Sequence, residues 1–182
     1  MDIGAQTELI RTRRLELLPL TAPVMDAVIA GRADKAAAEL GASLSRWLLD
    51  DPTHLVQLRR AAEAAASAGF GGSARVIVLS GARRRAIGSI GFHGAPDDAG
   101  RLEVACTIHP AHRGRGYGAE ATAALLDWAT ERFGVTRFLL ALPSHRRATN
   151  LVPIEMASRW TDRSTQAIDA LADLLEGRPP RV

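Results

Sequence analysis

Arg113-Gly114-Arg115-Gly116-Tyr117-Gly118-Ala119 is the stretch of sequence on which the interpretation of this chain depends. It lies between a strand-like run that ends at Ile108 and an amphipathic run over residues 120–130 that has helical periodicity. Glycines at alternate positions let backbone amides converge on an anion, and the positive end of the following helix dipole points to the same place. The stretch therefore predicts a binding site for a diphosphate.

Length and composition predict a single domain over residues 1–182, because the chain is 47% hydrophobic and too short for two comfortable cores. The single cysteine excludes an intrachain disulfide. Charges interrupt every long apolar stretch, and the N-terminus lacks the apolar region of a signal peptide. We therefore expect a cytoplasmic protein that binds no membrane.

The cations of the chain are spread along its length. The formal net charge is +3 and the sequence pI is 9.9, because Lys35 is the only lysine and arginine supplies the other cations. Nucleic-acid binding would need clustered cations among aromatic side chains, but aromatics make up only 4% of the chain. No nucleic-acid partner is predicted. Short arginine runs such as residues 83–85 have two interpretations, a contact for a phosphorylated ligand or a solvated surface edge.

The first third of the chain is mostly helical by its periodicity. A strand is expected over residues 13–20. The pattern after Thr21 predicts a capped helix that breaks near Gly31 and resumes over residues 33–40, and a further helix is expected after Pro52.

The middle of the chain changes to a strand pattern. Three runs over residues 76–79, 86–90 and 102–108 are joined by short Gly, Pro and Asp connections, which predict an antiparallel meander. After the helix, Gly134 predicts a C-cap, and residues 136–142 predict another strand that a crossover must reach.

The strand before the glycine stretch has two different faces. One face carries Leu102, Val104, Cys106 and Ile108, and the other carries Glu103, Ala105 and Thr107. The alternation makes Cys106 a buried small hydrophobe rather than an acyl nucleophile. Pro110 stops the strand, which leaves backbone groups near its end available to an extended ligand.

These elements in this order resemble the GNAT acyltransferase superfamily. Within it, the segments 88–97, 102–104 and 109–121 resemble the branch that includes the ribosomal-protein N-acetyltransferases. The match covers residues 8–142, about three quarters of the chain, and residues 143–182 diverge. The resemblance implies an α/β (α+β) fold with a mixed, mostly antiparallel central sheet and helices on both faces.

The resemblance also implies a function. It implies an N-acetyltransferase with acetyl-CoA as cosubstrate, which transfers the acetyl group to a primary amine by direct attack in a ternary complex. The acceptor would be a protein N-terminus or a small-molecule amine. The residues implied in donor binding are Thr107 and Ile108 beside the pantetheine, Arg113, Gly114, Arg115, Gly116, Tyr117, Gly118 and Ala119 at the pyrophosphate, and Asn150, the nearest match to an asparagine that opens a later helix in the family.

The glycines have two rival interpretations. Gly114-x-Gly116-x-x-Ala119 also matches the dinucleotide-binding fingerprint. In that fold the glycines follow the strand almost at once, whereas five residues separate Ile108 from Gly114 here, and no acidic residue directly follows the next strand. The spacing favours the acetyltransferase. A simple glycine turn without a ligand is the other alternative.

Glu103 is the candidate catalytic base, because the acceptor ammonium must lose a proton before its nitrogen attacks a thioester. The family often uses a strand glutamate in this place. The alternative is an exposed strand residue paired with an arginine. His109 and His112 have no further ligand near them in the sequence, so no metal is predicted.

The C-terminal segment departs from the family pattern. Tyr117 is the only tyrosine, so the tyrosine general acid common in the family is excluded, and a GNAT-like CoA-binding or regulatory domain with weak or lost catalysis stays open as a second function. Residues 164–176 predict a helix, and the tail has too few β-branched residues in alternation for two more strands. A homodimer formed through this segment is a hypothesis.

Overall fold

The computed structural model describes residues 8–44, 52–71, 74–142 and 150–155, and the structural statements below concern these residues. The strands are β1 (Ile10–Arg11), β2 (Leu15–Pro19), β3 (Arg75–Leu79), β4 (Arg85–Phe92), β5 (Arg101–Ile108), β6 (Arg137–Leu142) and β7 (Asn150–Glu155). The helices are α2 (Ala22–Ile29), α3 (Ala33–Leu40), α5 (Pro52–Ser67) and α6 (Tyr117–Phe133), with a short 3-10 turn, η1 (Pro110–His112).

The described strands form one seven-stranded sheet in the order of the chain, β1 to β7. Neighbouring strands are antiparallel except β5 and β6, which are parallel and joined by the crossover helix α6. The mixed, mostly antiparallel sheet and the meander β3–β4–β5 are confirmed. The dinucleotide-binding interpretation is wrong, because it requires a mostly parallel, doubly wound sheet.

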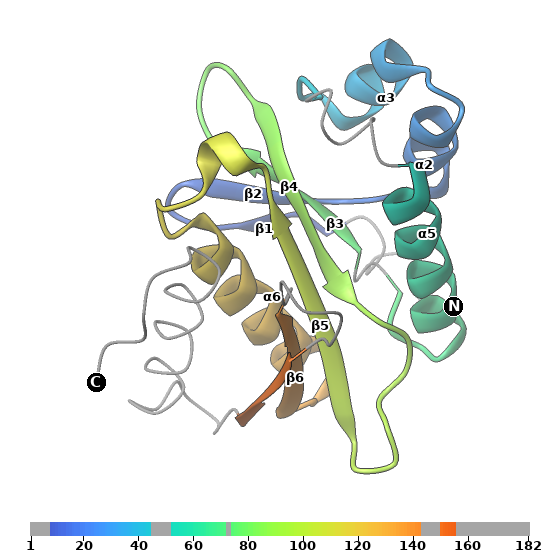
Figure 1. The fold of residues 1–182 in the computed structure, drawn as a ribbon, viewed down its shortest axis with the longest axis vertical. Coiled ribbons are helices and arrows are strands. Elements are labelled where there is room, and N and C mark those ends of the chain that lie inside the picture. Colours follow the sequence, from blue (N-terminus) through green and yellow to red (C-terminus); the bar gives the residue numbers. More distant parts are fainter. Residues whose placement is uncertain (1–7, 45–51, 72–73, 143–149, 156–182) are drawn as a thin grey trace.

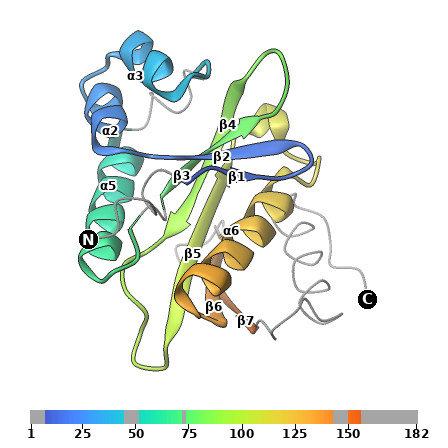
Figure 2. The ribbon, with the colours of Figure 1, turned by 180° about the vertical axis from the view of Figure 1, so that it is seen from behind.

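Helices cover both faces of the sheet, as predicted. α6 packs on one face, and α2 and α3 with part of α5 pack on the other (Figures 1 and 2). The α6 side contains the even-numbered residues of β5 together with Trp128. The opposite core joins the helical first third to Val76, Val78 and Ala86. None of the helices in the described ranges is long and apolar enough to cross a bilayer.

Several boundaries differ from the predictions. The first strand is shorter than residues 13–20 and pairs with the two-residue strand β1, which the pattern did not indicate. Thr21 lies at the N-cap of α2, but its side chain makes no capping hydrogen bond. The break before α3 occurs at Gly31, whose φ is +68°, as expected. α6 begins at Tyr117, three residues before the predicted start, so residues 117–119 are its first turn.

The C-terminal segment contains a strand that the sequence pattern missed. Residues 150–155 form β7, which pairs antiparallel with β6 along its whole length. The sequence pattern did not indicate this strand, because pairing with β6 overrides its weak alternation. The expectation that the tail does not form two more strands stays a prediction, since residues 156–182 lie outside the described residues. Asn150 opens a strand, not the helix that the family pattern suggested. The predicted helix over residues 164–176 lies outside the described residues.

Gly88 fixes the distance between β4 and β5, so we expect Gly88→Ala to destabilise the fold. A Cβ at this position would lie 2.2 Å from the backbone oxygen of Thr107, which neither strand can relieve without separating. Overpacking of this kind costs about 1–3 kcal/mol or more of unfolding free energy, which urea titration measures. Gly31→Ala is the control, because its Cβ meets nothing within 4 Å and carries only the strain of a positive φ. Equal losses in the two variants would refute the clash.

Candidate donor and acceptor site

The sheet opens along one side of β5. Its ladder with β4 continues to Ile108, but its ladder with β6 ends at the pair Ala105–Ala141. The amide of His93 donates to the carbonyl of Glu103 at 2.8 Å, and the amide of His109 donates to the carbonyl of Ile87 at 2.7 Å, so odd-numbered residues along β5 direct their backbone groups toward β4. By alternation, Ile108 directs its backbone groups toward the β6 side, past the end of that ladder. An extended ligand can therefore continue the sheet here, as Pro110 led us to expect.

The chain turns sharply between β5 and α6. η1 is held by the amide of Ala111, which donates to Nδ1 of His109 at 3.1 Å. Arg113 folds back, and its Nε donates to the carbonyl of Ile108 at 2.9 Å. This bond fixes Arg113, a predicted loop residue, beside the open side of β5 and uses only the Nε of its guanidinium.

The glycine stretch forms an anion-binding geometry at the start of α6. Gly114 and Gly116 have φ of +75° and +74°, a region that favours glycine. Gly116 is the N-cap residue, and no side chain caps this helix end. The first helical bond runs from the amide of Glu120 to the carbonyl of Gly116 at 3.0 Å. The amides of residues 117–119 therefore point out of the helix at its positive end.

Arg14, from the N-terminal hairpin, holds this loop from the side. Its Nη1 donates to the backbone carbonyl of Arg115 at 2.9 Å, and its guanidinium lies 4.7 Å from the ring centroid of Tyr117. Its Nε donates to the carboxylate of Glu120 at 2.5 Å. One side chain thus contacts the loop, the first helical residue and the first turn of α6.

Glu120 is the second half of this brace. Its carboxylate accepts from the hydroxyl of Thr12 at 2.6 Å and from the amide of Arg14 at 2.9 Å, and its side chain is only 18% exposed. Burial raises the pKa of Glu120, but the hydrogen bonds from Thr12 and Arg14 outweigh it and bring the pKa below its ordinary value. The carboxylate stays ionised and neutralised, so the helix end behind the loop stays positive. Sequence reasoning missed this pair because its members lie more than 100 residues apart.

The face of β5 that points away from α6 is the accessible one. The even-numbered residues of β5 are buried under α6, whereas Glu103, Ala105 and Thr107 on the other face are only half-buried. In Figure 1, β5 lies at the front and no described helix crosses it. The predicted orientation of Glu103, away from the apolar set, is confirmed.

Glu103 has a partner that the sequence did not indicate. Oε1 of Glu103 lies 3.2 Å from Nδ1 of His93, which follows the end of β4 on the same face. Their side chains are 34% and 46% exposed, so both reach solvent over the open face. Only the register of the β4–β5 hairpin, which pairs residues 93 and 103, could have signalled this contact.

Cys106, His109 and His112 are the remaining candidate residues. Cys106 is buried, and burial raises the pKa of its thiol to about 12, so it is a core residue as predicted and not a nucleophile. His109 and His112 lie edge to face with ring centroids 5.7 Å apart. Within the described ranges no three potential ligands gather into a metal site, and the expected lack of a metal stays a prediction.

A sheet that opens beside one strand, followed at once by a glycine loop and an uncapped helix, is the architecture of a CoA-dependent acetyltransferase. The chain matches the model of the acetyltransferase (GNAT) domain over residues 14–150. It is also 30% identical over 131 residues to the uncharacterized N-acetyltransferase YjdG of Bacillus subtilis (strain 168), a match that covers 71% of this chain and 76% of that protein.

Similar solved structures include a putative GNAT-family acetyltransferase from Bordetella pertussis, with 19% identity, 82% of this chain and 99% of that chain covered, and a TM-score of 0.54. Another is the ribosomal L7/L12 alpha-N-protein acetyltransferase RimL in complex with coenzyme A, with 15% identity, coverage of 91% and 82%, and a TM-score of 0.48. The chain belongs to the GNAT acetyltransferase family, as its motifs indicated. It is an N-acetyltransferase that uses acetyl-CoA as the donor.

Removal of the Arg14 side chain is expected to weaken CoA binding about tenfold, equivalent to about 1.4 kcal/mol of binding free energy. Arg14→Ala frees the Arg115 carbonyl and leaves the Glu120 carboxylate without its cation, close to the predicted site of the diphosphate. Calorimetric titration with CoA measures the effect. Arg13→Ala is the matched control, since this neighbouring arginine is exposed.

A double variant tests whether the two residues of the brace act together. Glu120→Gln added to Arg14→Ala should cost less than the sum of the single changes, because the uncompensated carboxylate is gone. Unchanged CoA affinity in Arg14→Ala, with a folded protein by circular dichroism, would refute the brace.

Proposed function

We propose that this enzyme acetylates a primary amine that approaches β5 from the face of Glu103, and that the amine attacks acetyl-CoA directly in a ternary complex. The acceptor is a protein N-terminus or a small-molecule amine. The single observation that carries the proposal is the end of the β5–β6 ladder at Ala105. It supports a reaction centre beside this residue.

The donor site proposed here is the one implied by the family resemblance. The diphosphate would lie on the loop Arg113–Ala119, supported by two left-handed glycines and by the outward amides of the first turn of α6. The pantetheine would lie along β5 at Thr107 and Ile108, where β6 no longer pairs. Asn150 stays a prediction, since its place at the start of β7 differs from the family pattern.

The proposed route of the thioester follows from the two directions that β6 and the core under α6 block. An extended arm that runs down β5 from the loop meets the β6 ladder at Ala105 and cannot continue in the plane of the sheet. On one face it meets Val104 and Cys106, which are buried under α6. The other face is open at Ala105, so the acetyl group would emerge beside Glu103.

Glu103 is the proposed base and His93 its positioning residue. The carboxylate accepts a proton from the acceptor ammonium, directly or through a water, and the free amine attacks the thioester carbonyl. The carbon–sulfur bond then breaks, and the amide nitrogen loses its second proton. Donation from Nδ1 of His93 to Oε1 at 3.2 Å would hold the carboxylate toward the open face.

The leaving thiolate has no tyrosine to protonate it in this mechanism. Tyr117, the only tyrosine, lies under the guanidinium of Arg14 in the loop. The proton would come from solvent or from the acceptor. This observation also favours the second candidate function, a CoA-binding or regulatory domain with weak catalysis, and turnover measurements separate the two.

The decisive assay combines turnover with donor binding. Acetylation of a panel of amines and N-terminal peptides is measured beside calorimetric CoA binding. CoA binding without thioester consumption would favour the regulatory domain, and the absence of both would overturn the donor site.

Variants of the His93–Glu103 pair test the assignment of the base. Glu103→Gln should lower kcat by about 10²–10⁴-fold, the usual contribution of a general base, while the Kd of CoA stays unchanged. His93→Asn retains a nitrogen donor close to the position of Nδ1, whereas His93→Leu removes it. We therefore expect Asn to preserve most of kcat and Leu to lose it. A Glu103→Gln enzyme with full turnover would remove this residue from the mechanism.

The whole chain is proposed as one cytoplasmic acetyltransferase domain that forms a homodimer through residues 143–182. The support is compositional and comes from the sequence of that segment. Light scattering over a wide concentration range tests it, with a mass of two chains as the expected result. A mass of one chain at every concentration would refute the dimer.

A further inference from the structure

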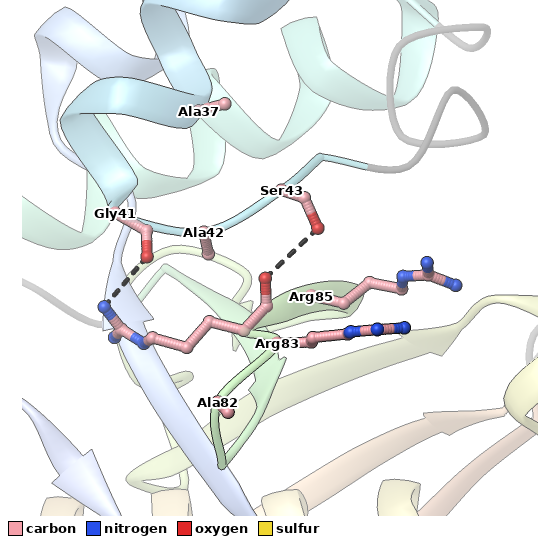
Figure 3. Close-up of a pocket in the computed structure, with 8 residues that line it drawn as sticks. Ala37, Gly41, Ala42, Ser43, Ala82, Arg83 and Arg85 are labelled. Atoms are coloured by element: carbon pink, nitrogen blue, oxygen red, sulfur yellow. Dashed lines mark hydrogen bonds between the residues drawn. The ribbon is translucent and has the colours of Figure 1, made fainter.

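A pocket lined by arginines lies between the end of α3 and the turn that joins β3 to β4. Its volume is about 560 Å³, and it is lined by Ala37, residues 41–43 and residues 82–85. Figure 3 shows Arg83 and Arg85 extending side by side in the same direction from this turn. The small alanine and glycine walls leave the arginines as the groups that decide what the pocket binds.

The walls of the pocket are tied together by specific bonds. The amide and the hydroxyl of Ser43 both donate to the carbonyl of Arg84, at 3.0 and 3.1 Å, and the carbonyl of Ser43 accepts from the amide of Ala86 at 2.9 Å. Nη1 of Arg84 donates to the carbonyl of Gly41 at 2.9 Å, and its Nε donates to Glu16 at 2.8 Å. Arg84 is therefore a neutralised structural residue.

Arg83 and Arg85 differ from Arg84 in that they are exposed and make no ion pair with an acid in the described part of the chain. Two neighbouring guanidinium groups without a carboxylate repel each other, and a bound anion removes this repulsion. The charge of Arg85 also acts on the turn before the loop. Burial lowers the pKa of His112, and the charges of His109, Arg115 and Arg85 lower it further.

The pocket lies where β5 would continue. In β4, the carbonyl of Ile87 accepts from the amide of His109. The amide of the preceding residue, Ala86, donates to the carbonyl of Ser43 instead. Ser43 thus follows the end of β5 along the edge of β4, and α3 packs on the face of the sheet opposite α6. An acceptor bound over that face would therefore meet the pocket beyond the end of the strand.

The distance along β5 between Ala105 and the arginine pocket restricts which acceptors can reach both. His109 lies four residues from Ala105, which is about 13 Å at the rise of a strand. An extended peptide rises by about 3.3 Å per residue, as a strand does. A peptide with its terminal amine at Ala105 therefore brings its fourth to sixth residues to the arginines. A free amino acid or a short amine is too small to do so.

We propose that Arg83 and Arg85 bind acidic side chains of the acceptor, and that the preferred acceptor is a protein N-terminus with Asp or Glu at about its fourth to sixth positions. This inference rests on the proposed function and specifies its substrate. The pair sets acceptor specificity and takes no part in donor binding.

The experiment uses three peptides of eight residues with the same free N-terminus and with Asp, Asn or Lys at positions 4–6. For the unmodified enzyme we expect kcat/KM to be about tenfold higher with the Asp peptide than with the Asn peptide, since a carboxylate forms stronger, charge-assisted hydrogen bonds with a guanidinium than a neutral amide does. The double variant Arg83→Gln/Arg85→Gln should lose this preference and keep the rate with the Asn peptide. Arg83→Glu/Arg85→Glu should prefer the Lys peptide.

Arg32→Gln/Arg60→Gln is the matched control, since it removes two exposed arginines elsewhere and changes the net charge equally. Equal rates with the Asp and Asn peptides, or a preference that survives Arg83→Gln/Arg85→Gln, would overturn the proposal. Weaker CoA binding in that variant would also overturn it, because the arginines would then act on the donor.

Failure of the proposed function gives a different result. In that case no peptide or amine is acetylated by any variant. Fluorescence anisotropy with a labelled Asp peptide then still tests the pocket, because the unmodified protein must bind it more tightly than Arg83→Gln/Arg85→Gln does. Equal binding would refute the arginine site.

Discussion

The geometry of this acetyltransferase depends on where one hydrogen-bond ladder ends. β5 keeps its antiparallel partner β4 to Ile108 but loses its parallel partner β6 after Ala105. Past this point the backbone of β5 faces a side without a neighbouring strand, where Arg113 donates to the carbonyl of Ile108, and the same strand then leads into the glycine loop. A single strand thus supplies both a surface for an extended arm and the approach to an anion site.

The anion site depends in turn on charge balance at the start of α6. A carboxylate in the first turn stabilises a helix, but beside a diphosphate it would repel the ligand. Glu120 avoids this conflict because Arg14 and Thr12 occupy its oxygens. The same guanidinium supports the loop carbonyl of Arg115, so the N-terminal hairpin contributes directly to the loop. The beginning and the middle of the chain therefore act as one site.

The two faces of β5 give the proposed donor and the proposed acceptor different places to bind. Apolar residues close the α6 face, and the half-buried residues of the other face lead from Glu103 toward the edge where Ser43 meets β4. Positive charge is concentrated at that edge. An acidic acceptor on the open face would reach the thioester carbonyl of a donor held along the strand without crossing the donor's path.

The sequence by itself determined the local parts of this protein: the left-handed glycines at 114 and 116, the two faces of β5, the burial of Cys106 and the family. These follow from periodicity and backbone sterics, which act over a few residues. Tertiary structure alone decided the Arg14–Glu120 brace, the contact of His93 with Glu103, the strand β7 and the arginine pocket. Each depends on strand register or on packing between distant segments, which no local pattern encodes.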